Sequence, residues 1–309
     1  MARKVLISDK IEEVCPAALR EAGIACDLKP GLPPEELLAA IPEYDGLIVR
    51  SATKVTAQVL EKGRAGKLRI VGRAGAGVDN IDVEAAGRLG VKVVNTPGLN
   101  SNAVAELTVA FAFMLARNLA LADSTLKAGR WEKKSLSGFE LSGKTFGLVG
   151  FGHVGRLVCA KAKGLGMRVL ACDPLVPAEE ARAAGAEPVS LEELWKEADF
   201  ISLHLPKNKD TLNLVDARVL ASFKPTACLI NCARGGLVDE AALFEALSRK
   251  SIAGAAFDVF AAEPPLGSPL LDLPNFIAAP HLGASTLEAQ LGVARKSAEL
   301  LAEFFRAQG

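Results

Sequence analysis

Three ionisable side chains follow the ends of predicted strands in the second half of the chain. Arg234 comes soon after a strand that ends at Asn231, and Glu263 and His281 follow the next two strands in the sequence. A carboxylate on one imidazole nitrogen would orient the ring, so that the other nitrogen could exchange a proton. A guanidinium can hold a carboxylate in bidentate fashion and polarise a neighbouring carbonyl. The set predicts oxidation of a 2-hydroxy acid. The alternatives are an ion pair for Arg234, a surface loop for Glu263 and a core position for His281.

A glycine-rich segment, GFGHVG at residues 150–155, lies between an apolar run and a potential helix, and the next strand ends at Asp173. Gly150 permits a tight turn, Gly152 lets a pyrophosphate approach the backbone, and Gly155 allows the helix to pack closely on the strand. The Asp173 carboxylate would accept hydrogen bonds from ribose hydroxyls and repel a 2′-phosphate. The segment therefore predicts a dinucleotide site that prefers NAD to NADP. A merely structural glycine turn is the alternative.

Two arginines, Arg50 and Arg73, each follow a predicted strand nearer the N-terminus. Because the carboxyl ends of parallel strands meet at one edge of a sheet, both indicate an anionic substrate. Solvated loop charges are the alternative. The turn at Gly75 and Gly77 offers backbone N–H groups to an anion, but it lacks the third glycine of a second dinucleotide loop.

The elements that must position these residues alternate between strands and helices. Residues 1–98 have the pattern of a small parallel βαβ domain, and a long helix at 285–305 is expected to return to it. The middle of the chain has the doubly wound dinucleotide-binding pattern. We therefore expect an α/β protein with two doubly wound parallel-sheet domains and a cleft between them. The smaller, flavodoxin-like substrate domain comprises 1–98 plus 285–309, and the Rossmann NAD-binding domain comprises 99–284. The strands are expected at 4–8, 46–49, 68–71 and 92–95, then at 145–149, 168–172, 199–203, 227–231, 253–258 and 275–279.

Composition argues against several other classes. The 309 residues include 36 Lys plus Arg and 36 Asp plus Glu, so the formal net charge is zero and nucleic acid is not an expected partner. The six cysteines lack metal-ligand spacing, and we expect reduced thiols and no metal site. The chain enters a strand pattern without a leader and has no apolar span of roughly 18 residues. A cytoplasmic location away from membranes is expected.

Five motifs together resemble the D-isomer-specific 2-hydroxyacid dehydrogenases, and the likeness covers nearly the whole chain. The last motif is similar to that of the subgroup that acts on phosphoglycerate. The resemblance implies a short form without the serine-binding regulatory domains of longer members, so feedback inhibition by serine through them is not expected. The motifs are VRSATKV at 49–55, GRAGAGVDN at 72–80, NCARGG at 231–236, DVFAAEPP at 258–265 and PHLGASTLEAQ at 280–290.

The resemblance also implies roles for individual residues. It implies Arg234, Glu263 and His281 as the catalytic set, with His281 as the acid/base. It implies a homodimer, possibly a tetramer, through the NAD domain, with an almost wholly apolar helix at 101–118 and the following helix at 119–134 in the interface. Ala76 and Leu205 stand where relatives often have threonine, which would remove polar contacts near the cofactor. The implied NAD contacts add His153, Val154, Cys232, Asp258, Gly283 and Ala284 to Gly150, Gly152, Gly155 and Asp173. The implied substrate contacts are Arg50, Arg73, Gly75, Ala76, Gly77 and Asn100.

The function implied is NAD-dependent oxidation of 3-phosphoglycerate to 3-phosphohydroxypyruvate, the entry to serine synthesis. Reduction of glyoxylate or hydroxypyruvate, or oxidation of D-lactate or another D-2-hydroxy acid, is the close alternative. A non-enzymatic protein that binds and responds to NAD is the distant one. In each enzymatic case the partner is a small anionic 2-hydroxy or 2-keto acid, phosphorylated in the first.

Overall fold

The computed structural model describes residues 3–308, which fold into two compact units. The first unit comprises Met1–Asn100 and Ala284–Gly309, and the second comprises Ser101–Gly283. Each unit is built around one parallel sheet, and the expected α/β class is confirmed. The expected domain bounds lie within two residues of the bounds of these units.

The first unit has a five-stranded parallel sheet in the order β2-β1-β3-β4-β5. The order reverses direction at β1, as in doubly wound sheets. The strands are β1 (Lys4–Ile7), β2 (Ala25–Leu28), β3 (Gly46–Val49), β4 (Ile70–Arg73) and β5 (Lys92–Asn95). The helices are α1 (Val14–Glu21), α2 (Pro34–Ala40), the 3-10 helix η1 (Ile41–Glu43), α3 (Ala57–Ala65), α4 (Val83–Leu89) and α12 (Leu287–Arg306).

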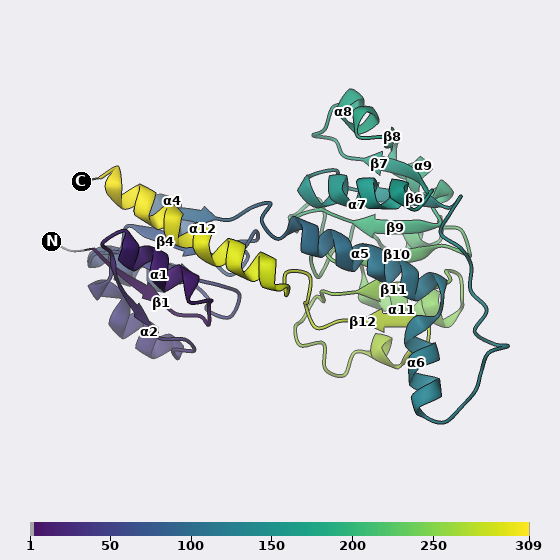
Figure 1. The fold of residues 1–309 in the computed structure, drawn as a ribbon, viewed down its shortest axis with the longest axis horizontal. Helices are drawn as coiled ribbons and strands as arrows, with labels where there is room; N and C mark the ends of the chain where they lie inside the picture. The colour runs from purple at the N-terminus through teal and green to yellow at the C-terminus, as the bar shows by residue number, and fades with distance from the viewer. Residues whose placement is uncertain (1–2, 309) are drawn as a thin grey trace. The chain divides into compact units, whose positions relative to one another are not determined.

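The C-terminal helix α12 belongs to this first unit. It lies beside α1 and across β3 and β4, as Figure 1 shows in yellow. A Cβ atom at Gly72 would come within 2.6 Å of Leu301 Cδ1, and one at Gly46 within 3.1 Å of Leu301 Cδ2. The two glycines therefore make room for a leucine of α12, and Val293, Ala298 and Leu301 join the buried core on this face of the sheet.

The second unit has a seven-stranded parallel sheet in the order β12-β11-β10-β9-β6-β7-β8. The order reverses between β6 and β9, which is where doubly wound sheets bind ligands. The strands are β6 (Thr145–Val149), β7 (Arg168–Cys172), β8 (Glu187–Pro188), β9 (Phe200–Leu203), β10 (Cys228–Asn231), β11 (Gly254–Phe257) and β12 (Phe276–Ala278). The helices are α5 (Ser101–Ala116), α6 (Leu119–Lys127), α7 (His153–Gly164), α8 (Ala178–Ala183), α9 (Leu191–Glu197), α10 (Ala217–Leu220), α11 (Glu240–Ser248) and the 3-10 helix η2 (Pro269–Asp272).

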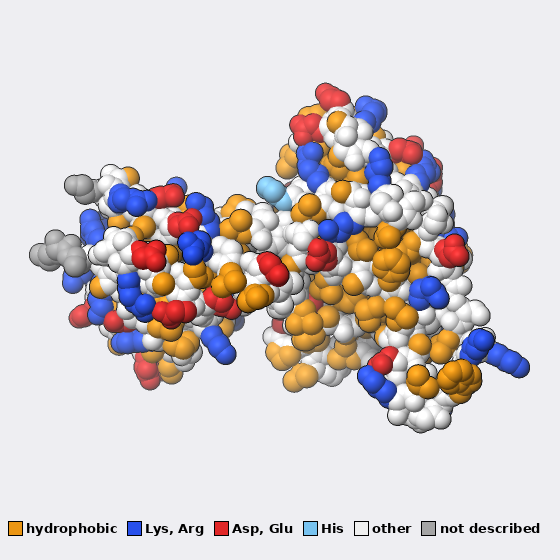
Figure 2. All heavy atoms as spheres, viewed as in Figure 1, with side chains coloured by type: hydrophobic (Ala, Val, Ile, Leu, Met, Phe, Trp, Pro, Cys, Tyr) orange, Lys and Arg blue, Asp and Glu red, His pale blue; other side chains and the backbone are white. Residues whose placement is uncertain are grey.

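Two apolar layers cover this sheet. Side chains of α5 and α7 pack on one face, and those of α9, α10 and α11 pack on the other. Hydrophobic side chains remain exposed around α5 and α6, and Figure 2 shows them in orange on the surface of this unit. Within residues 3–308 no single helix is long and apolar enough to cross a membrane. The pair α5 and α6, bent by 66°, passes the same length and composition test.

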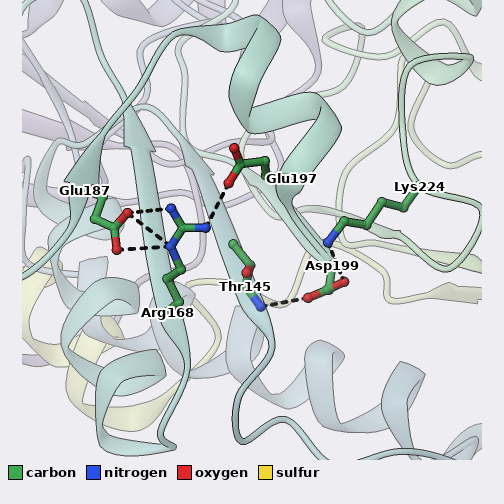
Figure 3. A network of polar contacts seen from close by, with 6 residues as sticks. All are labelled: Thr145, Arg168, Glu187, Glu197, Asp199 and Lys224. Carbon is green, nitrogen blue, oxygen red and sulfur yellow. Dashed lines mark hydrogen bonds and ion pairs between the residues drawn. The ribbon is translucent and has the colours of Figure 1, made fainter.

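Two groups of polar contacts lie at the amino ends of strands β6 to β9 (Figure 3). Arg168 at the start of β7 donates to Glu187 of β8 at 2.6 Å and to Glu197 of α9 at 2.8 Å. Asp199, just before β9, accepts the N–H of Thr145 at 2.8 Å and lies 2.9 Å from Lys224 Nζ. These contacts fasten the edge of the sheet opposite the carboxyl ends of its strands.

Candidate functional site

The carboxyl ends of β10, β11 and β12 lie side by side in the second unit. The register pairs Asn231 with Phe257, and Phe257 with Ala278. Arg234 follows the first of these strand ends and His281 the last. The parallel register therefore brings the loops that carry the expected catalytic residues to one edge of the sheet.

His281 and Glu263 form a direct pair. The Nδ1 atom of His281 lies 2.8 Å from Oε2 of Glu263. The other carboxylate oxygen, Oε1, accepts the backbone N–H of Phe260 at 3.1 Å. Because an ionised carboxylate can only accept hydrogen bonds, Nδ1 carries the hydrogen and Nε2 is left as the acceptor. The His281 side chain is half exposed, so its Nε2 edge is able to meet a substrate.

Asp258 holds the turn that presents His281. His281 has a left-handed backbone (φ 56°), which is uncommon for a residue other than glycine. Its N–H donates to the Asp258 carbonyl oxygen at 2.9 Å. The buried Asp258 carboxylate accepts the N–H groups of Leu282 at 2.6 Å and Gly283 at 2.7 Å. Burial raises the pKa of this carboxyl. The resemblance implied Asp258 only as a cofactor contact; its support of the histidine turn is a further role that the sequence did not reveal.

The Arg234 loop packs against the loop that carries Glu263. A Cβ atom at Gly235 would overlap the carbonyl group of Phe260, so only glycine allows this approach. Asn231 fixes the start of the loop, since its side chain accepts the N–H of Ala233 at 3.0 Å and donates to the Arg234 carbonyl at 2.9 Å. The Arg234 guanidinium donates to the Ala233 carbonyl at 2.7 Å. Backbone packing therefore determines the relative placement of the two loops.

The glycine loop has the geometry of a phosphate cradle. Gly150 has φ 97°, and a Cβ there would lie 2.6 Å from the His204 carbonyl oxygen. A Cβ at Gly155 would overlap the Gly150 carbonyl oxygen, so the helix sits tightly on the loop. A Cβ at Gly152 would instead project into open space, with no atom within 4 Å. That open space lies at the start of α7, where backbone N–H groups and the helix dipole favour an anion. The residues fit a dinucleotide pyrophosphate.

Asp173 links the glycine loop to the strand end beside it. Its Oδ2 accepts the N–H of Phe151 at 2.7 Å, and its Oδ1 accepts the N–H of Leu175 at 2.9 Å. Each carboxylate oxygen has a further lone pair for a ribose hydroxyl. A hollow of about 280 Å³, lined by Asp173, Pro174 and Val176 among others, opens at this position. The carboxylate thus both shapes the loop and faces space for a nucleoside.

The remaining cofactor candidates of the second unit lie around the same loops. His153 and Val154 begin α7 directly after the open glycine. Cys232 is buried after β10, and burial raises the pKa of its thiol to about 12, so it is a neutral group at physiological pH. His204, which follows β9, lies under the glycine loop; burial lowers its pKa to about 4.

The expected substrate residues and Ala284 belong to the first unit. The Arg73 guanidinium lies over Gly75, in the space that a Cβ atom there would occupy, and Gly75 has φ 149°. The Ala76 carbonyl accepts a hydrogen bond from Asn95 at 2.5 Å. Arg50 is partly exposed on the loop after β3, and Asn100 lies in the turn before α5. Within residues 3–308 no group of three or more His, Cys, Asp or Glu side chains has the arrangement of a metal site.

The chain is similar in sequence and in fold to known proteins. Residues 109–283 match the family model described as D-isomer specific 2-hydroxyacid dehydrogenase, NAD binding domain. The chain is 47% identical over 288 residues to D-3-phosphoglycerate dehydrogenase of Pongo abelii, covering 93% of this chain and 54% of the relative. It is 48% identical over 296 residues to D-3-phosphoglycerate dehydrogenase of Synechocystis sp., covering 96% and 53%. The chain thus spans about half the length of these curated relatives. The TT0316 protein from Thermus thermophilus superposes with a TM-score of 0.89 at 35% identity, covering 98% of this chain and 97% of that one.

Proposed function

The chain belongs to the D-isomer specific 2-hydroxyacid dehydrogenase family, and we propose that it oxidises 3-phosphoglycerate to 3-phosphohydroxypyruvate with NAD. The observation that supports this most is the 2.8 Å pair between Glu263 and His281, in which the loop of Glu263 also packs against the Arg234 loop. The choice of substrate is supported by relatives 46–48% identical that are named D-3-phosphoglycerate dehydrogenase.

In the proposed reaction Arg234 binds the substrate carboxylate in bidentate fashion and holds the hydroxyl-bearing carbon in place. His281 Nε2 accepts the hydroxyl proton as the carbonyl forms. Glu263 keeps the hydrogen of the imidazole on Nδ1 and stabilises the imidazolium that results. A bound NAD would supply the acceptor for the hydride that leaves the same carbon.

The glycine loop and Asp173 are proposed to hold that cofactor. The N–H groups at the start of α7 would bind the pyrophosphate beside Gly152, and the Asp173 carboxylate would accept the ribose hydroxyls. Asp173 carries a charge that opposes a 2′-phosphate, so we propose NAD rather than NADP. His153, Val154, Cys232, Asp258, Gly283 and Ala284 stay further candidates for cofactor contacts.

Arg50 and Arg73 are proposed to bind the anionic groups of the substrate, together with Gly75, Ala76, Gly77 and Asn100. Two guanidinium groups near one strand edge suit a substrate that carries both a carboxylate and a phosphate. Replacing Arg73 by Ala should therefore weaken the binding of 3-phosphoglycerate far more than the binding of an unphosphorylated substrate. Equal losses for phosphorylated and unphosphorylated substrates would rule out the phosphate role.

A panel of substrates tests the reaction. NADH absorbance is followed with 3-phosphoglycerate and D-lactate in the forward direction, and with 3-phosphohydroxypyruvate, hydroxypyruvate and glyoxylate in the reverse. The proposal requires the highest kcat/KM with the phosphorylated pair. A preference for hydroxypyruvate, glyoxylate or D-lactate would assign another activity of the family. NAD binding without turnover of any of these acids would point to a non-enzymatic NAD-binding protein.

We also propose that two copies of the chain pair through the second unit. The large side chains around α5 and α6 are exposed there, including Trp131, which is 80% exposed. A patch of this kind on one surface is typical of a protein–protein interface. The patch consists of Phe113, Leu119, Leu126, Trp131 and Phe139.

A further inference from the structure

The loop that carries Arg50 is held by a buried carboxylate from the neighbouring strand. Asp9, two residues beyond β1, is 5% exposed. Its Oδ2 accepts the N–H of Arg50 at 2.5 Å, and both of its oxygens lie within 3.2 Å of the Thr53 backbone nitrogen. Its Oδ1 also accepts the Thr53 hydroxyl at 2.6 Å. The carboxylate therefore gathers donors from both ends of one short loop, and these donors offset the cost of burying its charge.

A second side chain holds the same loop through its carbonyl groups. The Asn80 amide nitrogen donates to the Arg50 carbonyl at 2.8 Å and to the Thr53 carbonyl at 2.7 Å. The Asn80 carbonyl in turn accepts the N–H of Val55 at 2.8 Å. Asp9 thus accepts the N–H groups of Arg50 and Thr53, and Asn80 donates to the C=O groups of the same two residues. The loop between them exposes only Ser51 and Ala52 fully.

Asn80 also lies on the segment that follows β4. That segment begins directly after Arg73, the last residue of β4, and carries Gly75; both are proposed anion-binding residues. The Asn80 contacts therefore link the two segments that are proposed to meet the substrate. A carboxylate that fixes the Arg50 backbone fixes the direction of the Cα–Cβ bond, and so the region that the guanidinium can reach.

We propose that Asp9 and Asn80 are positioning residues that orient Arg50 toward the anionic groups of the substrate. This inference rests on the function proposed above, in which Arg50 is a substrate contact. Neither positioning residue touches the substrate. Their effect on the reaction passes through the Arg50 backbone, so it appears as substrate affinity and vanishes when the guanidinium is absent.

A double-mutant cycle that combines Asp9→Asn with Arg50→Gln tests this proposal. The quantities measured for each variant are the KM for 3-phosphoglycerate, kcat and the KM for NAD. The Asn side chain has the same shape, but its NH₂ group would face a backbone donor. Loss of a hydrogen bond to a charged group should raise the KM for 3-phosphoglycerate roughly tenfold. We expect kcat to change by less than about twofold, and the KM for NAD to stay unchanged. In the Arg50→Gln background Asp9→Asn should add less than about twofold.

Asp45→Asn is the matched control in the same sheet. Asp45 is also buried, at 9% exposure, and accepts the N–H of Lys4 at 2.9 Å, but it lies at the amino end of β3, whereas Arg50 follows the carboxyl end. It should alter thermal stability without altering the KM for 3-phosphoglycerate. If Asp9→Asn does not fold, Thr53→Val removes the hydroxyl contact to Asp9, together with the hydroxyl contacts to Ser8, and it should raise the same KM roughly threefold.

The outcomes distinguish failure of the positioning role from failure of the proposed reaction. The positioning role alone would be overturned if Asp9→Asn raised the KM for 3-phosphoglycerate equally in the wild-type and Arg50→Gln backgrounds. It would also be overturned if Asp45→Asn raised this KM as much as Asp9→Asn does. An unchanged KM in Arg50→Gln would overturn both this role and the substrate contact of Arg50. If the wild-type protein did not oxidise 3-phosphoglycerate, the proposed reaction would fail and this inference with it.

Discussion

The imidazole of His281 meets the carboxylate of Glu263 through Nδ1 at 2.8 Å, which leaves Nε2 facing away from the pair. The carboxylate is itself held, because its second oxygen accepts the Phe260 N–H. The pair thus has a defined tautomer and orientation before any ligand binds. This is the arrangement that a histidine acid/base needs at neutral pH.

Glu263→Gln should reduce kcat roughly 100-fold. Gln has one oxygen, and the Phe260 N–H competes for it. The Gln NH₂ group would then face Nδ1 and favour the tautomer with hydrogen on Nε2, which cannot accept a proton. Steady-state kinetics with 3-phosphoglycerate measures the loss. Glu240→Gln is the control, since Glu240 accepts the Ala261 N–H at 2.7 Å on the same loop. A similar loss in both variants would contradict the acid/base role of the pair.

Gly235→Ala should damage both stability and activity. The added Cβ would overlap the Phe260 carbonyl group, which is backbone and unable to move alone. The Arg234 loop and the Glu263 loop would have to separate, so we expect kcat/KM to fall at least about 100-fold and the free energy of unfolding by about 2 kcal/mol. Thermal unfolding and steady-state kinetics measure the two effects.

Gly164→Ala is the control for that substitution. Gly164 ends α7, and a Cβ there would meet no atom within 4 Å. Alanine has the better helix propensity, so this change should leave kinetics unaltered and stabilise by up to about 1 kcal/mol. If Gly235→Ala behaved like Gly164→Ala, the close approach of the two catalytic loops would not matter for activity.

Asp173→Ala should erode the preference for NAD over NADP. The substitution removes the charge that opposes a 2′-phosphate and also releases the Phe151 N–H. We expect kcat/KM for NAD to fall about tenfold or more, the worth of one hydrogen bond to a charged group. The ratio of kcat/KM for the two cofactors is the measurement. An unchanged ratio would count against a ribose contact.

The burial of His204 predicts that the folded protein becomes less stable as the pH falls. Burial lowers its pKa to about 4 from the ordinary 6.5, and its Nε2 is inaccessible to solvent. Between these values the unfolded chain binds more protons than the folded one, so the stability that His204 contributes is complete above pH 6.5 and is lost as pH falls towards 4. The loss amounts to at most about 3 kcal/mol.

Chemical denaturation of wild type and His204→Gln across this pH range tests the effect. The difference between their unfolding free energies should narrow as the pH falls, because Gln does not take up the proton. A difference that does not change with pH would contradict the lowered pKa, because it would mean that His204 binds the proton equally in the folded and unfolded states.

Leu126→Glu should dissociate the proposed dimer. Leu126 lies in α6 and is 58% exposed, and a charge buried in an apolar interface lacks a partner. Sedimentation velocity should show the mass of two chains for the wild type and of one for the variant. Leu212→Glu, at 57% exposure outside the patch, is the matched control and should not change the mass. A wild-type monomer would exclude the interface.

The sequence predicted the fold best where strands are buried runs of apolar residues. The expected strands at 145–149 and 168–172 coincide with β6 and β7. The short edge strands β2 and β8 were missed, since edge strands have exposed faces and little apolar patterning. The helix expected at 119–134 was wrong beyond Lys127, where the chain turns through Gly129 with φ 75°.

For the candidate site, the sequence predicted only which residue types follow the ends of the strands. Parallel strands bring their carboxyl ends to one edge, so Glu263 and His281 could be paired from the order of the strands. The residues that hold this pair in place could not be predicted from the sequence. Asp258, Gly235 and Asp9 act through backbone groups, and such contacts leave no spacing pattern in the sequence.

The central claim is that Arg234, Glu263 and His281 oxidise a phosphorylated 2-hydroxy acid. The most direct measurement is the initial rate of NADH formation from 3-phosphoglycerate by the wild type and by His281→Gln, together with equilibrium binding of NADH to both. We predict turnover by the wild type, a fall in kcat of at least about 100-fold in the variant, and equal NADH affinity. Turnover that survives the loss of His281, or a wild type that favours D-lactate over 3-phosphoglycerate, would contradict it.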